Sequence, residues 1–505
     1  MESRIPESRL TVRNGAPARA DGDYVLYWCT AARRLDWNFA LDRAIEWARE
    51  LKRPLLVLEG LRVDYPWASP RLHRFVLQGM AANRAAAAGK PLLYRPYVET
   101  KAGAGKGLLA ALARHACVVI GDDYPCFFLP RMVAAASAAV HVRFETVDSN
   151  GLLPINAAAT TFPSAYAFRR FWQKEMAGTL AHFPRPDPWK GVELPRLAAL
   201  PATVESRWPE PSGLLLSGDV AAIERLPLRG KVPPAPFDGG TPAARAALVD
   251  FVARKLPRYG EERSDPDADA ASGLSPWLHF GHLSAHEVFA EVARREQWKR
   301  GDLGAPNGGK KEGFWQMSAA AESFLDELIG WRELGFNFCH HRPDYAEFES
   351  LPEWAKETLR KHALDERLHT YSLEQFAAAR THDPVWNAAQ RELVTTGRMH
   401  NYLRMLWGKK IVEWTKSPQQ AAEFMIELNN RYAVDGRDPN SYSGIFWVLG
   451  RYDRPWAPER DVFGVIRWMS SANTLKKLRM KEYLAKWSDA AGGAKPADGA
   501  LFGAK

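Results

Sequence analysis

Two tryptophans stand seven residues apart in MHNYLRMLWGKKIVEW (residues 399–414), a stretch with the composition of a helix. Seven residues at about 100° each return to nearly the same helix face, roughly 10 Å further along the axis. Trp407 and Trp414 therefore share one stripe with Leu403 and Ile411. The chain has 19 Trp in all, a number that fits core filling, an interface or redox chemistry. From the helix alone, a core-facing stripe is the simpler interpretation.

A second stretch, FLDELIGWREL, places a carboxyl group and an indole four residues apart. Glu327 and Trp331 would share one face of a helix. A carboxyl side chain can form hydrogen bonds with the polar edge of a planar ring, and an indole can stack on its face. From this stretch alone, core packing is the simpler interpretation of the tryptophan.

A third stretch, SGLSPWLHFGHLS, has a Ser–Gly–Leu–Ser turn that leads into a helical pattern. Backbone N–H groups at a helix start, together with serine hydroxyls, suit a pyrophosphate group. An ordinary N-cap is the alternative interpretation.

Several other patterns indicate no site. AGAGKG (residues 102–107) lacks the spacing of a phosphate-binding loop, and no G-x-G-x-x-G, G-x-S-x-G or H-E-x-x-H motif is present. The 4 Cys form no C-x-x-C pair, so we expect neither a zinc site nor a disulfide framework. Free thiols are typical of a reducing, intracellular setting.

The elements that must position these stretches fall into two kinds. Strand-like runs alternate with helical patterns up to about residue 148, and amphipathic helices alone follow from residue 243. Alternation of strands and helices predicts a parallel sheet with helices on both faces. The fold class we predict is therefore an N-terminal Rossmann-like, doubly wound domain joined by a long linker to an all-helical domain. The strand-like runs are 24–28, 54–60, 91–95, 116–123 and 140–148, and the main helical patterns are 36–51, 241–256, 284–297, 322–334, 373–379, 386–397 and 400–414.

The expected boundaries follow composition. Residues 1–22 read as a flexible arm, 23–182 as the α/β domain, 183–242 as a Pro-rich linker, 243–488 as the helical domain and 489–505 as a disordered tail. At 505 residues the chain is too long for one ordinary core.

Charge favours an acidic partner. The net charge is +9, and residues 386–479 carry 15 Lys+Arg against 9 Asp+Glu. Such a surplus is typical of nucleic-acid binding. No apolar run reaches the length of a membrane span, and the first 20 residues have no apolar core of a secretory signal.

Four motifs in order carry a resemblance to a known family: residues 272–284, 324–338, 382–414 and 428–450. They closely resemble the photolyase–cryptochrome family, and within it the class II cyclobutane pyrimidine dimer photolyases. The resemblance runs from about residue 23 to 480 and is strongest in the helical half.

The resemblance implies FAD, bound in a U shape inside the helical domain. Asn429 matches the residue facing the flavin N5, and Arg404 with Asp435 matches a pair flanking the isoalloxazine, although an ordinary salt bridge would look the same. An amide near N5 tunes redox states that differ by one proton, and a cation beside the ring stabilises an anionic reduced flavin. The residues matching the phosphate site are Tyr259, Ser272, Gly273, Leu274 and Ser275.

The resemblance also implies a substrate: a cyclobutane pyrimidine dimer flipped out of UV-damaged DNA. Flipping is needed because a dimer inside a duplex cannot reach a buried flavin. The matching substrate and DNA residues are Glu327, Trp331, Met405, Trp447, Trp456, Arg263 and Arg467.

The tryptophan stripe gains a second interpretation from the family. Trp407 would lie near the flavin, Trp386 in the middle and Trp414 outermost, close to solvent, so that electrons hop along them to reduce an oxidised flavin. The α/β half resembles the part of the family that holds a light-harvesting antenna, a deazaflavin or a folate. The chain departs from the family's pattern in two places: it has a longer loop at residues 301–313, and the segment after Arg467 does not match the family's motifs.

The implied activity is light-driven repair: reduced FAD donates an electron to the dimer, the ring splits and the electron returns. We expect an intracellular, monomeric enzyme. A cryptochrome-like photoreceptor is one alternative, and the substrate residues and short C-terminal extension argue against it. A (6–4) photoproduct photolyase, which would need a histidine acid such as His279 or His282, is another. A light-independent flavoprotein or a plain nucleic-acid-binding module is the third.

Overall fold

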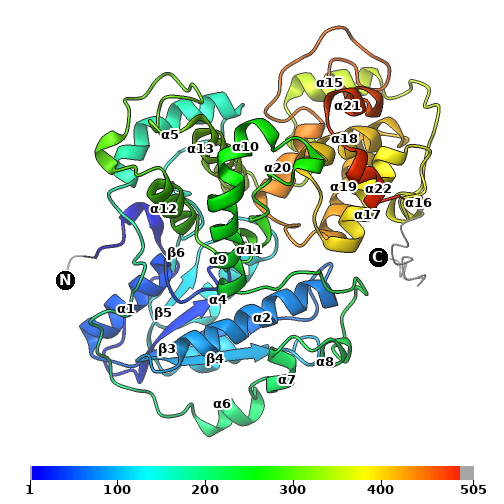
Figure 1. The fold of residues 1–505 in the computed structure, drawn as a ribbon. Helices are drawn as coiled ribbons and strands as arrows, with labels where there is room; N and C mark the ends of the chain where they lie inside the picture. Colours follow the sequence, from blue (N-terminus) through cyan, green and yellow to red (C-terminus); the bar gives the residue numbers. More distant parts are fainter. Residues whose placement is uncertain (1–2, 489–505) are drawn as a thin grey trace.

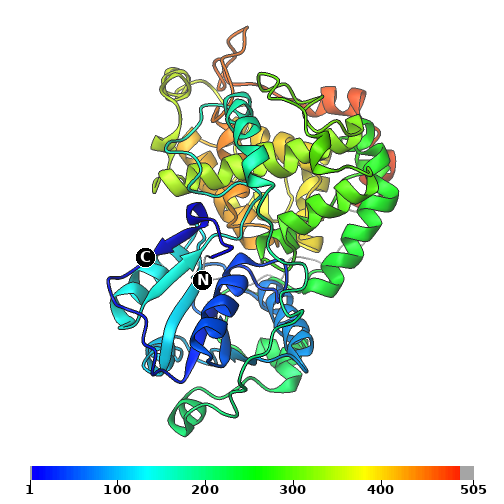
Figure 2. The same cartoon turned by 90° about the vertical axis from the view of Figure 1, so that its left-hand side faces the viewer.

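The structure is a computed structural model that describes residues 3–488. An α/β part lies at the bottom of Figure 1 and a helical part at the top, and the turned view in Figure 2 keeps this division. One six-stranded sheet has the order β1-β6-β5-β2-β3-β4. The strands from β2 to β6 pair in parallel, and β1 is antiparallel to β6. The strands are β1 (Leu10–Val12), β2 (Tyr24–Cys29), β3 (Leu55–Leu61), β4 (Leu93–Val98), β5 (Ala116–Asp122) and β6 (Phe144–Val147).

The central strand β2 is buried on both faces, which is why it reads as a continuous apolar run. Val25 and Tyr27 face a cluster with α1 (Phe39–Leu51), while Leu26 and Trp28 face the cluster of α3 (Leu108–Ala113) and α4 (Leu129–Ala139). Another helix, α2 (Pro70–Ala87), packs along β4. The predicted doubly wound fold is therefore confirmed.

The expectation that residues 1–22 form a flexible arm is wrong for the segment that includes residues 5–12. Residues 10–12 form β1 and pair with β6, and Arg9 is buried in an ion pair with Asp148. Ile5 lies in the same buried cluster as α1. A strand of three residues is too short to show the alternation of apolar and polar residues that marks a strand. Its partner β6 lies some 135 residues further along the chain, so the local sequence pattern did not reveal this edge strand.

The linker 183–242 runs along the outside of the α/β part before it turns up into the helical part (Figure 1). It contains three short helices that the Pro-rich sequence did not predict. Two of them pack against α2, and the other packs against α3. These helices are α6 (Ala202–Arg207), α7 (Gly213–Leu216) and α8 (Val220–Glu224).

The helix α5 (Ala165–Thr179) lies within the expected α/β domain but packs with the helical part. Its Phe168 and Trp172 share a buried cluster with Trp315 and Leu328. Gln173 of the same helix accepts from Gly309 N–H at 2.9 Å and donates to Lys310 O at 3.0 Å, which holds the loop at residues 301–313. The structural division therefore falls before α5, not after it.

The helical part is built around α18 (Asn401–Glu413), which packs against α17 (Pro384–Thr396), α19 (Pro418–Tyr432) and α20 (Pro439–Val448). Within residues 3–488, no helix is both long and apolar enough to cross a membrane. The remaining helices are α9 (Thr241–Asp250), the π-helix η2 (Phe251–Lys255), α10 (Leu256–Glu262), α11 (Ser275–His279), α12 (Ala285–Arg295), α13 (Ala319–Leu325), the π-helix η5 (Asp326–Trp331), α14 (Arg332–His341), α15 (Glu353–Lys361), α16 (Leu373–Ala377), α21 (Ser471–Lys477) and α22 (Lys481–Lys486). The predicted tail, 489–505, lies outside the described residues.

Candidate functional site

Two predicted flavin residues, Ser275 and Arg404, meet at the carboxylate of a third, Asp435. The Ser275 hydroxyl at the start of α11 donates to Asp435 Oδ2 at 2.6 Å, and Arg404 Nη2 of α18 lies 3.2 Å from Asp435 Oδ1. Burial alone would raise the pKa of Asp435, but Arg404 and the Ser275 hydrogen bond outweigh it, so the pKa lies below its ordinary value. Asp435 is therefore an anion that fixes the direction of the Arg404 guanidinium.

The turn before α11 brings in a residue that the sequence reasoning missed. Gly273 has φ +64°, which favours glycine, and a Cβ there would lie 3.4 Å from Arg398 Nη1. The Nε and Nη2 atoms of Arg398 are buried without a hydrogen-bond partner among the described residues. Burial lowers its pKa to about 10, so it remains a cation. Arg398 is half-buried, and its guanidinium lies 3.7 Å from the Phe237 ring centroid. Its unpartnered Nε and Nη2 atoms, near the Ser272–Gly273–Leu274 backbone, fit an anionic ligand group.

Asn429 lies near the C-terminal end of α19 and is only 4% exposed. Its Nδ2 donates to Asn430 Oδ1 at 3.3 Å, and Asn430 Nδ2 donates to Tyr442 Oη at 3.1 Å. This short chain of amides restricts the orientation of the Asn429 side chain.

Two predicted substrate residues form an ion pair: Arg263 Nη1 donates to Glu327 Oε1. The Arg263 guanidinium also lies 5.4 Å from the ring centroid of Tyr259. Each of the two charged side chains is about a quarter exposed, so both are accessible to a ligand.

Glu327 and Trp331 lie on the π-helix η5, not on the regular α-helix that the pattern 322–334 predicted. Hydrophobic periodicity does not separate one wide turn from an α-helix, and π-turns are common at functional sites. Asp326, the neighbour of Glu327, is buried and accepts from Arg169 Nε at 2.7 Å. That ion pair joins η5 to α5 and fixes the helix segment that presents Glu327.

Trp447, Trp456 and Arg467 form a cation–aromatic cluster. The Arg467 guanidinium lies 3.9 Å from the Trp456 centroid and 5.6 Å from the Trp447 centroid. Asp453 accepts from Arg467 Nε and from Trp456 Nε1, each at 3.1 Å. The segment after α20 is therefore held against the end of that helix.

Trp331 and Met405 complete the predicted substrate set, and both are half-buried. Trp331 and Trp447 pack against the same buried cluster. Their helices are close because α14, which continues η5, packs against α20. A Cβ on Gly335 would lie only 2.7 Å from Ser443 Oγ, so this approach requires glycine.

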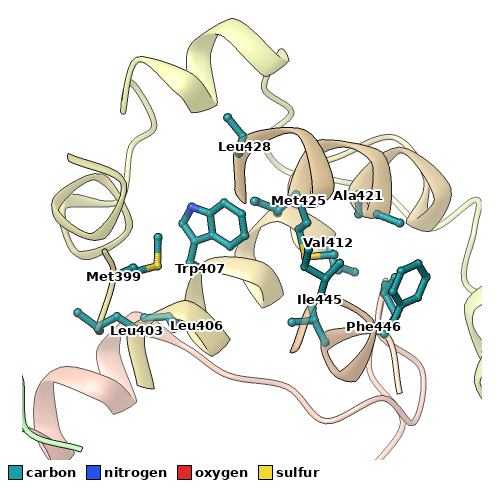
Figure 3. Close-up of a cluster of buried hydrophobic side chains, with 14 of the residues drawn as sticks. Met399, Leu403, Leu406, Trp407, Val412, Ala421, Met425, Leu428, Ile445 and Phe446 are labelled. Atoms are coloured by element: carbon teal, nitrogen blue, oxygen red, sulfur yellow. The ribbon is translucent and has the colours of Figure 1, made fainter. Parts of the chain in front are cut away.

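The three predicted electron-transfer tryptophans are in contact. Trp386 stacks on Trp407 with ring centroids 6.4 Å apart, and it meets Trp414 edge-on at 6.2 Å. Trp407 also lies among the buried side chains of α18, α19 and α20 (Figure 3). The expectation that Trp414 lies close to solvent is wrong: it is 2% exposed, because Tyr371, Phe376 and His382 cover it.

A cavity of about 710 Å³ lies in the α/β part rather than at the predicted flavin residues. Trp28 at the end of β2 and Tyr124 after β5 line it. The sheet order reverses between these two strands, which is the place where open α/β sheets bind ligands. His279, Phe280 and Arg437 of the helical part close it on one side.

The two histidines of the sequence-based alternative do not join the substrate residues. His279 Nδ1 lies 3.3 Å from Asp438 Oδ2 and lines the cavity. His282 is fully buried, its Nδ1 accepts from the Gly240 N–H at 2.9 Å, and burial lowers its pKa to about 3.

No family model matches the chain. Curated relatives match over almost its whole length. A deoxyribodipyrimidine photo-lyase from Methanothermobacter thermautotrophicus is 34% identical over 480 residues, which are 95% of this chain and 98% of the relative. Photo-lyases from Potorous tridactylus and from rice are 32% and 34% identical over 92% of this chain, which is 81% and 87% of theirs.

Solved structures share the fold at lower identity. A class III photolyase from Agrobacterium tumefaciens aligns with a TM-score of 0.65 at 17% identity, covering 92% of this chain and 86% of the other. A Synechocystis cryptochrome aligns with the same TM-score at 16% identity, covering 92% and 88%. The identity to the curated relatives, over nine-tenths of the chain, shows that it belongs to the photolyase family.

Proposed function

We propose that this chain is a light-dependent DNA repair enzyme that splits cyclobutane pyrimidine dimers. The observation that carries the proposal is the meeting of side chains far apart in sequence: Ser275 and Arg404 at Asp435, and Arg263 at Glu327. These sets lie in the helical part of a member of the photolyase family.

The residues fit FAD. Arg398 supplies a half-buried cation beside the Ser–Gly–Leu–Ser turn, as a pyrophosphate requires, and Tyr259 lies in the adjoining buried cluster. Arg404, oriented by Asp435, supplies a cation for the ring system. Asn429 supplies an amide whose orientation is restricted by Asn430. When bound in its reduced form, FAD supplies the light-driven electron transfer that splits the dimer.

The substrate side contributes binding and orientation. When DNA binds, Arg263 leaves its ion pair with Glu327 and binds a DNA phosphate. The freed Glu327 carboxyl group then forms a hydrogen bond, as acceptor or donor, with the polar edge of the flipped bases. Trp331 and Trp447 provide apolar faces for the bases. Met405 contacts the dimer with a flexible side chain that can fit an irregular pocket. No general acid–base pair is needed, because the donated electron opens the ring and returns without any step that transfers a proton.

Trp386, Trp407 and Trp414 serve as the route by which an oxidised flavin regains electrons. Contact between neighbouring rings gives a continuous path for hopping along the three, and packing in the core supports the indoles. The core and electron-transfer interpretations of the stripe are compatible.

The α/β cavity is the proposed site of an antenna chromophore. Its volume is in the range of small-molecule pockets, and its lining is mainly aromatic and apolar with a few cations such as Arg33 and Lys106. A deazaflavin or a folate, both planar and polar at one end, suits such a lining. The cavity reaches His279 on the helix α11, whose first residue is Ser275, so an antenna there would lie near the flavin.

DNA is the proposed partner, bound by a monomer inside the cell. Lys and Arg contacts to phosphates would give affinity that is independent of sequence and falls steeply with salt.

The test uses two oligonucleotides, one with a cyclobutane dimer and one with a (6–4) photoproduct. We expect light-dependent repair of the first only, because neither candidate histidine acid lies with the substrate residues: His279 lines the α/β cavity, and His282 is fully buried with a pKa lowered to about 3. Repair of the (6–4) substrate alone would contradict the proposal, and repair of neither by flavin-loaded protein would favour the photoreceptor alternative.

A further inference from the structure

Lys409 is a fully buried cation on the helix that carries Arg404, Met405 and Trp407. It follows Met405 by one turn, so the two share a helix face. An isolated buried ammonium is costly, and such groups are retained where they have partners. Nothing in the reaction described above uses this residue.

The partners of Lys409 lie on the substrate side. Its Nζ donates to Val448 O, the last carbonyl of α20, at 2.6 Å. The same Nζ lies 5.0 Å from the ring centroid of Trp447. Cations are favoured at helix C-termini and over indole faces, so one ammonium satisfies both. Burial lowers the pKa of Lys409 to about 7, so the charged form that makes both contacts predominates below that pH, while the neutral amine can still donate to Val448 O.

The contact depends on a close approach of two helices. A Cβ on Gly408 would lie 2.6 Å from Val448 Cγ2, so only glycine lets α18 come this near to α20. Gly408 therefore sets the helix separation at which the Lys409 side chain reaches the end of α20.

Lys409 is also the inner end of an alternating stack. Lys409 lies over Trp447, Arg467 lies between Trp447 and Trp456, and Arg454 lies 4.4 Å from the Trp456 centroid. Exposure increases along this stack, from 0% at Lys409 to the exposed Arg454. Asp453 is the carboxylate that faces the group, and Arg467 is the other nearby cation.

We propose that Lys409 is a positioning residue for lesion recognition, holding the indole of Trp447 and the segment with Arg467 in the orientation that receives the flipped dimer. The inference rests on the proposed function, because it takes Trp447 as a substrate residue. Because Lys409 is fully buried against Val448 and Trp447, the proposed role acts through Trp447 and not through direct contact with DNA.

The test compares affinities of the FAD-loaded, full-length protein for a dimer-containing and an undamaged duplex. The affinities are measured at pH 6.5, where Lys409 is mostly charged. Lys409→Met keeps an unbranched apolar stem, is one atom shorter and removes the charge. We expect its affinity for the damaged duplex to fall about tenfold, equivalent to about 1.4 kcal/mol, with little change for the undamaged duplex. Lys174→Met, an exposed lysine on α5, is the matched control and should bind as wild type.

Two further variants separate the failure of this inference from that of the proposed function. Trp447→Ala alone should lower damaged-duplex affinity, and adding Lys409→Met to it should cost little more, because the lysine acts through the indole. If Trp447→Ala has no effect, both proposals for this region fail. If Trp447→Ala weakens binding but Lys409→Met does not, or if the two losses add in full, or if Lys409→Met weakens both duplexes equally, the positioning role is overturned.

Discussion

The indole of Trp386 lies parallel to that of Trp407, with 6° between the ring planes and 6.4 Å between centroids, although the residues are 21 positions apart on different helices. A hydrogen bond from Trp386 Nε1 to Trp407 O at 3.0 Å fixes the pair. Gln390 Oε1 accepts from Trp407 Nε1 at 2.8 Å. These two hydrogen bonds restrict the orientation of both indoles.

Trp407→Phe should block photoreduction of the oxidised flavin, because phenylalanine fills the space but is far harder to oxidise than an indole. The measurement is the loss of oxidised-flavin absorbance under blue light with an external reductant. Trp172→Phe is the matched control: Trp172 is equally buried, belongs to another cluster, and its indole N–H has no hydrogen-bond partner within residues 3–488. Normal photoreduction in Trp407→Phe would mean that the route is wrong or bypassed.

Glu327→Ala should lower the rate of dimer repair while FAD remains bound, because Glu327 lies on the substrate side and pairs with Arg263 rather than with the flavin set. Loss of one hydrogen bond from a carboxyl group corresponds to about 1.5–3 kcal/mol, or roughly 10- to 100-fold. Glu357→Ala, at an exposed site on α15, serves as control. Wild-type repair rates in Glu327→Ala would remove its assigned role.

Asn429→Ala should change which redox form of the flavin persists, because the amide is held by Asn430 in one orientation and interacts differently with protonated and unprotonated N5. Absorption spectra recorded during photoreduction and reoxidation in air check this. Spectra identical to those of wild type throughout would exclude a role at N5.

Stability should depend on pH through Lys409. Burial lowers its pKa from 10.5 to about 7, and Asp453 only partly opposes this. Between these values the unfolded chain holds a proton that the folded chain lacks, so this residue makes the free energy of unfolding rise with pH from about 7 to 10.5. Urea denaturation at pH 6.5 and pH 9.5 should show wild type gaining stability relative to Lys409→Met at the higher pH. Equal differences at both values would show that the lysine stays charged.

Much of the fold was predictable because it depends on local pattern. Buried parallel strands such as β2 and β5 read as apolar runs. The tryptophan stripe of α18 was predicted from its spacing, although the structure buries the lysines of that helix as well. The predictions that were wrong concern features that depend on residues far away in the sequence. The strand β1 exists because β6 offers an edge, and Trp414 is buried because a loop with Tyr371 covers it.

The candidate site was predicted unevenly for the same reason. Ser275 and Glu327 stand in motifs long enough to be matched, and the structure brings each to a charged partner that was also predicted. Arg398 stands in a polar stretch and Lys409 stands beside a second lysine, Lys410. For both side chains, solvent exposure is the ordinary expectation. Only burial, seen in three dimensions, distinguishes them.

Repair of a thymine-dimer oligonucleotide by the purified, flavin-containing protein, in blue light and in darkness, tests the central claim most directly. We predict that the reduced protein restores intact thymines under light, with no conversion in the dark. Equal conversion in light and darkness, or none in light by protein whose visible spectrum shows reduced flavin, would contradict the account.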